Sequence, residues 1–263
     1  MADELTNLLY PWLVALALAV ARIGAAAFIV PFLGGQVLSG AVRNAVIVAL
    51  AIPVVPVVHA SLGGTTVTPL AMLGLAAKEV FLGIVIGFLS SIAFWGAVGV
   101  GYVMDNQRGT TLASVYDPFV GEQTSPTGQF LQVVLIVLFH ASGGLHLFLD
   151  VLYESYRTWP AGTFWPRPDA RFPLFLLGQA DRVMRVTVVL AAPVVIAVFL
   201  AEFGLGLMNR FAPQMNAFSL SMPVKSLVGA IVLVVYLPFL LGLTGDEFLA
   251  LGGLTKLLDG LLR

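Results

Sequence analysis

An apolar run at positions 70–104 constrains this chain most, because its 35 residues contain only two charges, Lys78 and Glu79. A bilayer core of about 30 Å is crossed by about 20 helical residues. A helix of 35 residues extends about 52 Å at about 1.5 Å per residue. Such a helix has to tilt, break, or project beyond the bilayer into a protein assembly.

Five further apolar runs lie at positions 8–33, 37–58, 130–152, 172–208 and 224–258. Hydrophobic residues make up 59% of the chain and charged residues 10%, whereas soluble domains carry about 25% charged residues. A soluble fold of this length has no way to bury so much apolar surface. We therefore expect an all-α, polytopic membrane protein with about six apolar helical segments, forming one membrane domain over 1–263.

Several classes of function lack their usual sequence signals. The net charge of −1 gives no reason to expect a nucleic-acid partner. The chain has no cysteine, and it contains no nucleophile elbow, zinc-protease motif or phosphate-binding loop. We expect no enzymatic activity, no catalytic residues, no cofactor and no metal site.

Charged residues within or at the edges of the apolar runs are expected to face protein or water, because a charge at the bilayer centre costs about 2.5–3.5 kcal/mol. They are predicted to make inter-helix or inter-subunit contacts: Arg22, Arg43, Lys78, Glu79 and Glu202. Lys78 and Glu79 are adjacent and point to different helix faces, so we do not expect them to pair. For Lys78 and Arg43 the alternative is snorkelling at a helix end.

Glu79, Gly83 and Gly87 form one stripe along the longest run, at spacings of four residues. Small residues at this spacing let two helix backbones approach closely. We expect the stripe to face another helix and Glu79 to be buried against it.

Two longer motifs carry the most specific information. The first reads DNQRG at positions 105–109 and continues to YDP at 116–118. The second reads RFAPQMNAFSLSMPVKS at positions 210–226. Both closely resemble the T subunit of the type III secretion export apparatus, the SctT family, which is homologous to the flagellar export protein FliR. Further positions that look like this family are Arg22, Pro31, Gly34, Arg43 and the stripe of Glu79, Gly83 and Gly87.

This resemblance covers nearly the whole chain, and the first motif looks more like the injectisome (virulence) branch than the flagellar one. It implies a non-enzymatic, multi-pass subunit of the type III protein secretion export gate in the bacterial inner membrane. Such a subunit helps to form and close the entrance of the protein-conducting channel. The implied partners are the R, S and U subunits, the secreted proteins that pass through the shared channel, and lipid.

The resemblance also implies an architecture, in which helical hairpins assemble into a helical export-gate complex. Residues 1–171 resemble the R-type helical part, and residues 172–263 resemble an S-type helical hairpin.

The first motif is then expected to be a channel-closing loop that follows an apolar helix. Its residues are Asp105, Asn106, Gln107, Arg108, Gly109, Leu112, Val115, Asp117 and Pro118. Leu112 and Val115 occupy positions where flagellar relatives place aromatic residues, and they remain apolar. The alternative is that residues 105–108 form a polar cluster at a helix end with local hydrogen bonds.

The second motif is expected to be a turn that faces partner subunits, with Arg210, Pro213, Gln214, Asn216, Pro223 and Lys225. We expect Pro213 to end one helix and Pro223 to lie near the first position of the next. Lys225 would then lie in a first turn, at the positive end of the helix dipole. We therefore expect a carboxylate partner for Lys225, in this chain or in the U or S subunit; the alternative is a solvated lysine.

Two other functions stay open at this point. A small secondary transporter or channel would use Glu79 and Glu202 as a polar path. An intramembrane enzyme would depend on Asp105 or Glu202.

Overall fold

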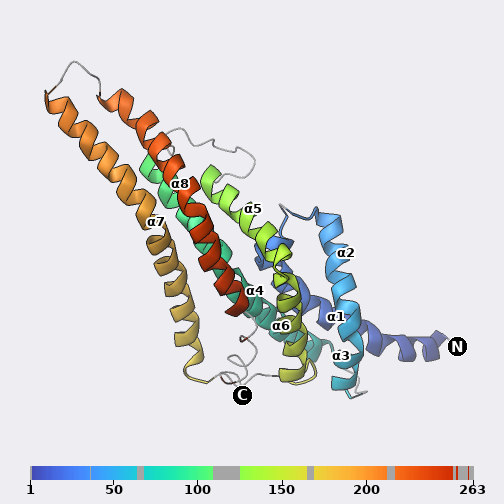
Figure 1. Cartoon of the computed structure of the whole chain (residues 1–263). Coiled ribbons are helices and arrows are strands. Elements are labelled where there is room, and N and C mark those ends of the chain that lie inside the picture. Colours follow the sequence, from blue (N-terminus) through green and yellow to red (C-terminus); the bar gives the residue numbers. More distant parts are fainter. Residues whose placement is uncertain are drawn as a thin grey trace. The chain divides into compact units, whose positions relative to one another are not determined.

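The computed structural model of the chain is built from helices. It describes residues 2–35, 37–63, 68–108, 125–164, 169–211 and 217–250, with the single positions 253 and 260. The helices, with η marking a 3₁₀-helix, are α1 (Ala2–Ile29), η1 (Pro31–Leu33), α2 (Gly40–Ala51), η2 (Ile52–Val54), α3 (Val55–Ser61), α4 (Pro69–Arg108), α5 (Pro126–Ala141), α6 (Gly144–Thr158), α7 (Phe172–Phe211) and α8 (Ala217–Ala250) (Figure 1).

Within the described residues, five helical segments are long and apolar enough to cross a membrane: Leu9–Ile29, Gly40–Ser61, Pro69–Arg108, Phe172–Phe211 and Leu220–Gly242. A sixth candidate is the pair α5 and α6, which passes the same test only as one broken span. The break lies at Gly143, whose backbone has φ of 80°, a conformation that glycine adopts without steric cost. The predicted all-α, polytopic class with about six apolar segments is confirmed.

The long apolar run at 70–104 forms one unbroken helix, α4, of 40 residues. Pro69 stands at its first position and no proline follows within it, so nothing in the sequence removes a backbone hydrogen bond from its interior. At about 1.5 Å per residue the helix is about 60 Å long. The expectation that this run is broken is therefore wrong. The helix has to tilt in the bilayer or project beyond it.

Helices α4, α5 and α6 extend beyond the apolar runs at 70–104 and 130–152. The polar stretch at 105–108 continues α4, and α5 already begins at Pro126. The aromatic stretch from Tyr153 to Thr158 belongs to α6. In both places polar side chains find partners that stabilise the helix end, as described below.

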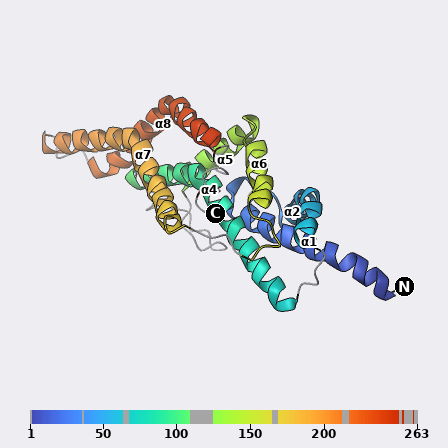
Figure 2. The same ribbon diagram turned by 90° about the horizontal axis from the view of Figure 1, so that it is seen from below.

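The chain folds into two compact units. Unit 1 comprises Met1–Ser91, Gly143–Gly178 and Phe248–Arg263, and unit 2 comprises Ile92–Ser142 and Gln179–Glu247. In unit 1, α1 packs against α2 and α3, and these helices lie side by side in both views (Figure 1 and Figure 2). Its core includes Phe32 and Phe148, whose rings meet edge to face at 5.1 Å.

The core of unit 2 brings Phe94 of α4 and Phe139 of α5 together, with ring centroids 5.5 Å apart. Backbones also approach closely here, because a side chain on Gly101 would overlap the backbone of Gly128. Only 11% of the most apolar 18-residue stretch of α8 is buried within the chain. The apolar surface of α8 is therefore available to lipid or to other subunits.

The second motif is placed differently from the prediction. Helix α8 begins at Ala217, so Pro223 lies inside it and Lys225 lies beyond its first turn. A proline removes one backbone hydrogen bond but is tolerated in a membrane helix where neighbours satisfy the freed group. The argument from the helix dipole at Lys225 is therefore wrong.

Candidate functional site

The first site is a buried charged cluster in unit 1, where α1, α4 and α6 meet. Arg22 of α1 donates from Nε to Oε2 of Glu79 at 2.6 Å and from Nη2 to Oε1 at 2.9 Å. Its Nη1 donates to Oγ of Ser155 at 2.9 Å, and its Nη2 donates to the carbonyl of Trp159 at 2.8 Å. Both charged side chains are fully buried. One guanidinium thus binds α4, α6 and the residue that follows α6.

Lys78 lies beside this ion pair, also buried, with 4% of the residue exposed. Its ammonium donates to the carbonyls of Pro160, Ala161 and Thr163 at 2.9–3.0 Å. It also lies 2.8 Å from Oε1 of Glu79. The prediction that adjacent Lys78 and Glu79 would not pair is wrong, because the long lysine side chain reaches back to the carboxylate. Snorkelling of Lys78 to a headgroup is excluded as well.

The cluster joins two cations to one carboxylate, and peptide carbonyls and the Ser155 hydroxyl supply the remaining acceptors. A buried charge is tolerated only when it is paired and hydrogen-bonded. The aromatic ring of Tyr156 adds to this environment, because the Arg22 guanidinium lies 4.0 Å from the ring centroid. Removing Glu79 would leave Arg22 and Lys78 as buried, unpaired charges.

The glycines on the stripe of Glu79 lie against α1. A methyl group on Gly83 would overlap the carbonyl of Arg22, and one on Gly87 would come within 2.9 Å of the carbonyl of Ala26. The absence of side chains here lets α4 approach α1 closely enough for Arg22 to reach Glu79.

The second site is a polar cluster in unit 2, at the end of α4 and the start of α5. Asp105 accepts hydrogen bonds from Oγ of Ser125 at 2.5 Å, from the backbone N of Thr127 at 3.1 Å and from Oγ1 of Thr127 at 2.6 Å. Arg108 lies one turn further along α4 and binds both Asp105, at 3.1 Å, and Thr127, at 2.6 Å. The carboxylate thereby ties the last turn of α4 to the first turn of α5. We call these four residues the 105–127 clasp.

Helix α8 packs closely against the clasp at Gly229. A methyl group added to this glycine would lie only 3.0 Å from Cδ of Arg108. Sequence reasoning missed Ser125 and Thr127. Ser125 is the N-cap of α5 and its hydroxyl accepts from the backbone N of Gly128. A serine followed by a proline is the available signal, since these two residues favour the N-cap and the first helical position.

The remaining residues of the first motif divide into two groups. Asn106 and Gln107 lie exposed on the last turn of α4. Gly109, Leu112, Val115, Asp117 and Pro118 fall outside the described residues. Residues 105–108 end a helix, as the polar-cluster alternative expects, but one local hydrogen bond joins Asp105 and Arg108 and the other hydrogen bonds described above for these two residues go to α5 and its N-cap.

The residues of the second motif are also only partly described. Lys225 of α8 lies 3.2 Å from Oε1 of Glu202 of α7, so the expected carboxylate partner is in this chain. Arg210 is exposed in the last turn of α7, and Pro213, Gln214 and Asn216 lie outside the described residues. Arg43, in α2, places its guanidinium 4.2 Å from the ring centroid of Phe28.

These arrangements weaken the transporter alternative. Both oxygens of Glu79 accept hydrogen bonds from Arg22, and Glu202 pairs with Lys225. A carboxylate engaged in this way is a poor carrier for a transported cation.

Comparison with known proteins decides the family. The family model described as bacterial export proteins, family 1, matches residues 13–251. The chain belongs to this family. It is therefore a multi-pass membrane protein of the bacterial export apparatus that serves type III secretion and flagella, and the predicted inner-membrane localisation is confirmed. The family consists of export components and not of enzymes, as the sequence led us to expect.

Individual relatives give the same result. The chain is 41% identical to the Yop proteins translocation protein T of Yersinia pestis over 209 residues, which cover 79% of this chain and 80% of the relative. It is 39% identical to the surface presentation of antigens protein SpaR of Salmonella typhimurium over 221 residues, 84% of this chain and 81% of the relative. Identity to the flagellar biosynthetic protein FliR of Bacillus subtilis is 30% over 162 residues, 61% of this chain and 62% of the relative. The resemblance to the type III export T subunit is confirmed.

Proposed function

We propose that this chain helps to form and close the entrance of the protein-conducting channel, in an export gate assembled with the R, S and U subunits. Secreted proteins pass through the shared channel, and residues 109–124 contribute to its closure. The chain itself performs no chemistry in this proposal. Its R-like part, 1–171, and its S-like hairpin, 172–263, each contact neighbouring subunits.

The observation that carries this proposal is the 105–127 clasp. Arg108 and Ser125 flank a segment of 16 residues, 109–124, and Asp105 binds both flanks. One carboxylate therefore binds the residues on both sides of this segment. In this proposal Leu112 and Val115, which belong to the segment, supply the apolar side chains that exclude water from the closed channel.

The exposed apolar surface of α8 supports assembly with other subunits. Within the described part of the helix, exposed residues include Leu227, Val234 and Val235, the last with 77% of its surface accessible. Lipid can cover such residues, but the adjacent pair of Lys225 and Glu202 is more readily accommodated next to protein. We therefore place the S-like hairpin against sister subunits.

The test of closure is electrical. The complete export complex is purified with this chain carrying glycine at positions 112–115 and is reconstituted in a planar bilayer without secretion substrate. We expect the glycine variant to conduct ions at least tenfold more than the native complex, because no apolar side chains remain there to exclude water.

The matched control is Ser114→Gly, which adds flexibility in the same segment but keeps Leu112 and Val115. This control should stay as closed as the native complex. If the full glycine variant also stays closed, while its complex has normal composition, the segment does not close the channel.

A further inference from the structure

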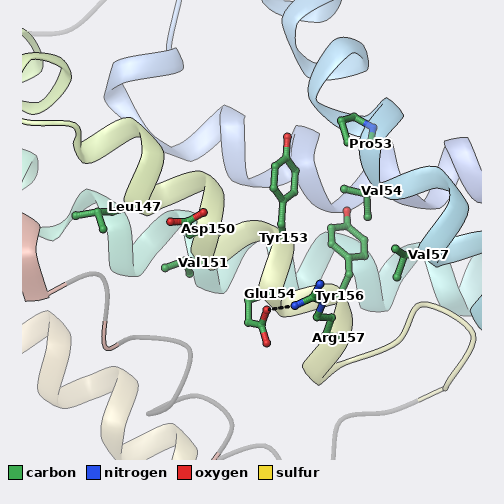
Figure 3. Close-up of a pocket in the computed structure, with 10 residues that line it drawn as sticks. All are labelled: Pro53, Val54, Val57, Leu147, Asp150, Val151, Tyr153, Glu154, Tyr156 and Arg157. Atoms are coloured by element: carbon green, nitrogen blue, oxygen red, sulfur yellow. Dashed lines mark hydrogen bonds and ion pairs between the residues drawn. The ribbon is translucent and has the colours of Figure 1, made fainter.

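A groove of about 560 Å³ in unit 1 is lined by α6 on one side and by η2 and α3 on the other (Figure 3). Its apolar walls are formed by Pro53, Val54, Val57, Leu147 and Val151. Its polar residues, Asp150, Tyr153, Glu154, Tyr156 and Arg157, all come from α6. Apart from Tyr156, whose ring also contacts Arg22, the groove shares no residue with the buried charged cluster or the 105–127 clasp.

Most of the polar groups in the groove are already engaged within the chain. Glu154 pairs with Arg157 at 3.2 Å, as the dashed line in Figure 3 marks. The Tyr153 hydroxyl donates to the carbonyl of Leu50 at 3.2 Å, and the Tyr156 hydroxyl donates to the carbonyl of Ala19 at 2.9 Å. Among the described residues, none forms a hydrogen bond or ion pair with Asp150.

Asp150 thus has no ion-pair partner among the described residues, and it lies on α6, one half of the bent helix pair that is a candidate membrane span. Ionisable residues in such segments pair with one another or with an opposite charge, because hydrocarbon does not solvate them. The one basic residue of the groove, Arg157, is held by Glu154. The counter-charge for Asp150 therefore has to come from outside the described part of this chain.

The shape of the groove indicates which cation fits. Lys and Arg place a methylene stem along apolar surface and keep their charged head at a polar site. The apolar walls offer a surface for the stem, and Asp150 offers an acceptor for the head.

The polar surface of α6 indicates that the cation is carried by a helix. His146, Asp150, Glu154 and Arg157 are all exposed and follow one another at helical spacing, which places them on one face. This face is about 16 Å long, at about 1.5 Å per residue. A helix packed along α6 covers such a length, whereas one lipid headgroup does not.

We propose that this groove receives a Lys or Arg side chain from a membrane helix of another export-apparatus subunit, with Asp150 as its ion-pair partner. The assignment rests on membership of the apparatus and not on closure by residues 109–124. Either proposal can therefore fail without the other.

The first test measures how much of the other export subunits is recovered with the tagged chain from gently solubilised membranes. Asp150→Lys places like charges together and is expected to lower recovery at least tenfold, and Asp150→Asn severalfold. The matched control is the double variant Asp169→Asn and Arg171→Gln, which removes an exposed ion pair outside the groove without changing the net charge. It should stay within twofold of the native chain.

The second test keeps Asp150 in place. The chain has no cysteine, so His146→Cys, one turn before Asp150 on the same exposed face of α6, carries a single benzophenone label while the carboxylate stays intact. After illumination, mass spectrometry should find the label on a partner helix, within two residues of a Lys or Arg. Changing that basic residue to Asp should restore at least half of the recovery lost in Asp150→Lys.

Three results would overturn the assignment. One is full recovery of the complex and normal secretion with Asp150→Lys. Another is a label found only on lipid, which would make the groove a lipid site. The third is a label on a partner helix that has no Lys or Arg nearby.

Discussion

Arg22 and Glu79 lie 57 positions apart and form an ion pair with two hydrogen bonds, 2.6 and 2.9 Å long, with both side chains fully buried. In a chain with so few charges, this pair fixes how α1 meets α4. It also explains why the stripe of Gly83 and Gly87 has no side chains, since the two helices have to approach closely for the guanidinium to reach the carboxylate.

Glu79→Gln should strongly destabilise unit 1. The substitution leaves Arg22 and Lys78 as buried cations without a carboxylate, and breaking a buried pair from one side costs about 3–5 kcal/mol. Thermal unfolding of the detergent-solubilised chain measures this as a clear fall in midpoint temperature. Arg171→Gln, which removes one partner of an exposed ion pair with Asp169, is the control and should not shift the midpoint. Equal midpoints for both variants would show that the buried cluster does not hold the unit together.

Gly83→Ala should destabilise the chain although it adds a single methyl group. That methyl overlaps the backbone carbonyl of Arg22, and a backbone contact cannot move aside as a flexible side chain can. Gly206→Ala in α7 is the control, because open space surrounds its added methyl group. In an open helical position, alanine is more favourable than glycine by about 0.5–1 kcal/mol. The unfolding midpoint is therefore expected to fall for Gly83→Ala and to rise for Gly206→Ala. A rise for both variants would contradict the close approach of α4 to α1.

Ser125→Ala should loosen the 105–127 clasp without removing any charge. It deletes the N-cap of α5 and one hydrogen bond to Asp105, and losing an N-cap costs about 0.5–2 kcal/mol. If the clasp positions residues 109–124, the reconstituted complex should leak ions in the closed state, although less than the complex with glycine at 112–115. Ser142→Ala is the control, because within the described part of the chain its hydroxyl binds only the carbonyl of Phe139, one turn earlier. If the complex with Ser125→Ala conducts no more ions than the native complex, the clasp does not contribute to closure.

Lys225→Glu should reduce assembly or secretion, because it places two carboxylates together where Lys225 now pairs with Glu202 at 3.2 Å. The double variant Lys225→Glu and Glu202→Lys restores opposite charges and should recover most of the lost secretion. Glu202 is half exposed, so the pair is worth roughly 1 kcal/mol or less. A secretion assay checks all three forms. If the double variant is no better than Lys225→Glu alone, the basic group acts on a partner outside this chain.

The apolar segments could be predicted from the sequence because hydropathy and run length depend on neighbouring residues alone. The orientation of the stripe at Glu79 could be predicted for the same reason, since a spacing of four residues defines a helix face. The pairing of Glu79 with Arg22 could not, because it depends on how two distant helices pack. The position of Lys78 depends in addition on the carbonyls of residues 160–163, which approach it only in the folded chain.

Helix ends were the least predictable part of both motifs. Asp105 and Arg108 look like the start of a polar loop, yet their bonds to Ser125 and Thr127 keep them helical. Pro223 looks like the start of a helix, yet α8 begins at Ala217. The sequence marks Asp105 and Arg108 as polar and Pro223 as helix-perturbing, and both descriptions are correct. Tertiary contacts decide the helix end in the first case, and the surrounding apolar helix decides it in the second.

The central claim is that this chain acts within a shared export gate and not alone. The measurement that tests it most directly is affinity purification of the tagged chain from gently solubilised native membranes, with mass spectrometry of the intact particles. The account predicts one large complex of fixed stoichiometry that contains other small hydrophobic export subunits. Recovery of a lone monomer or homodimer that moves ions across liposomes by itself would contradict it.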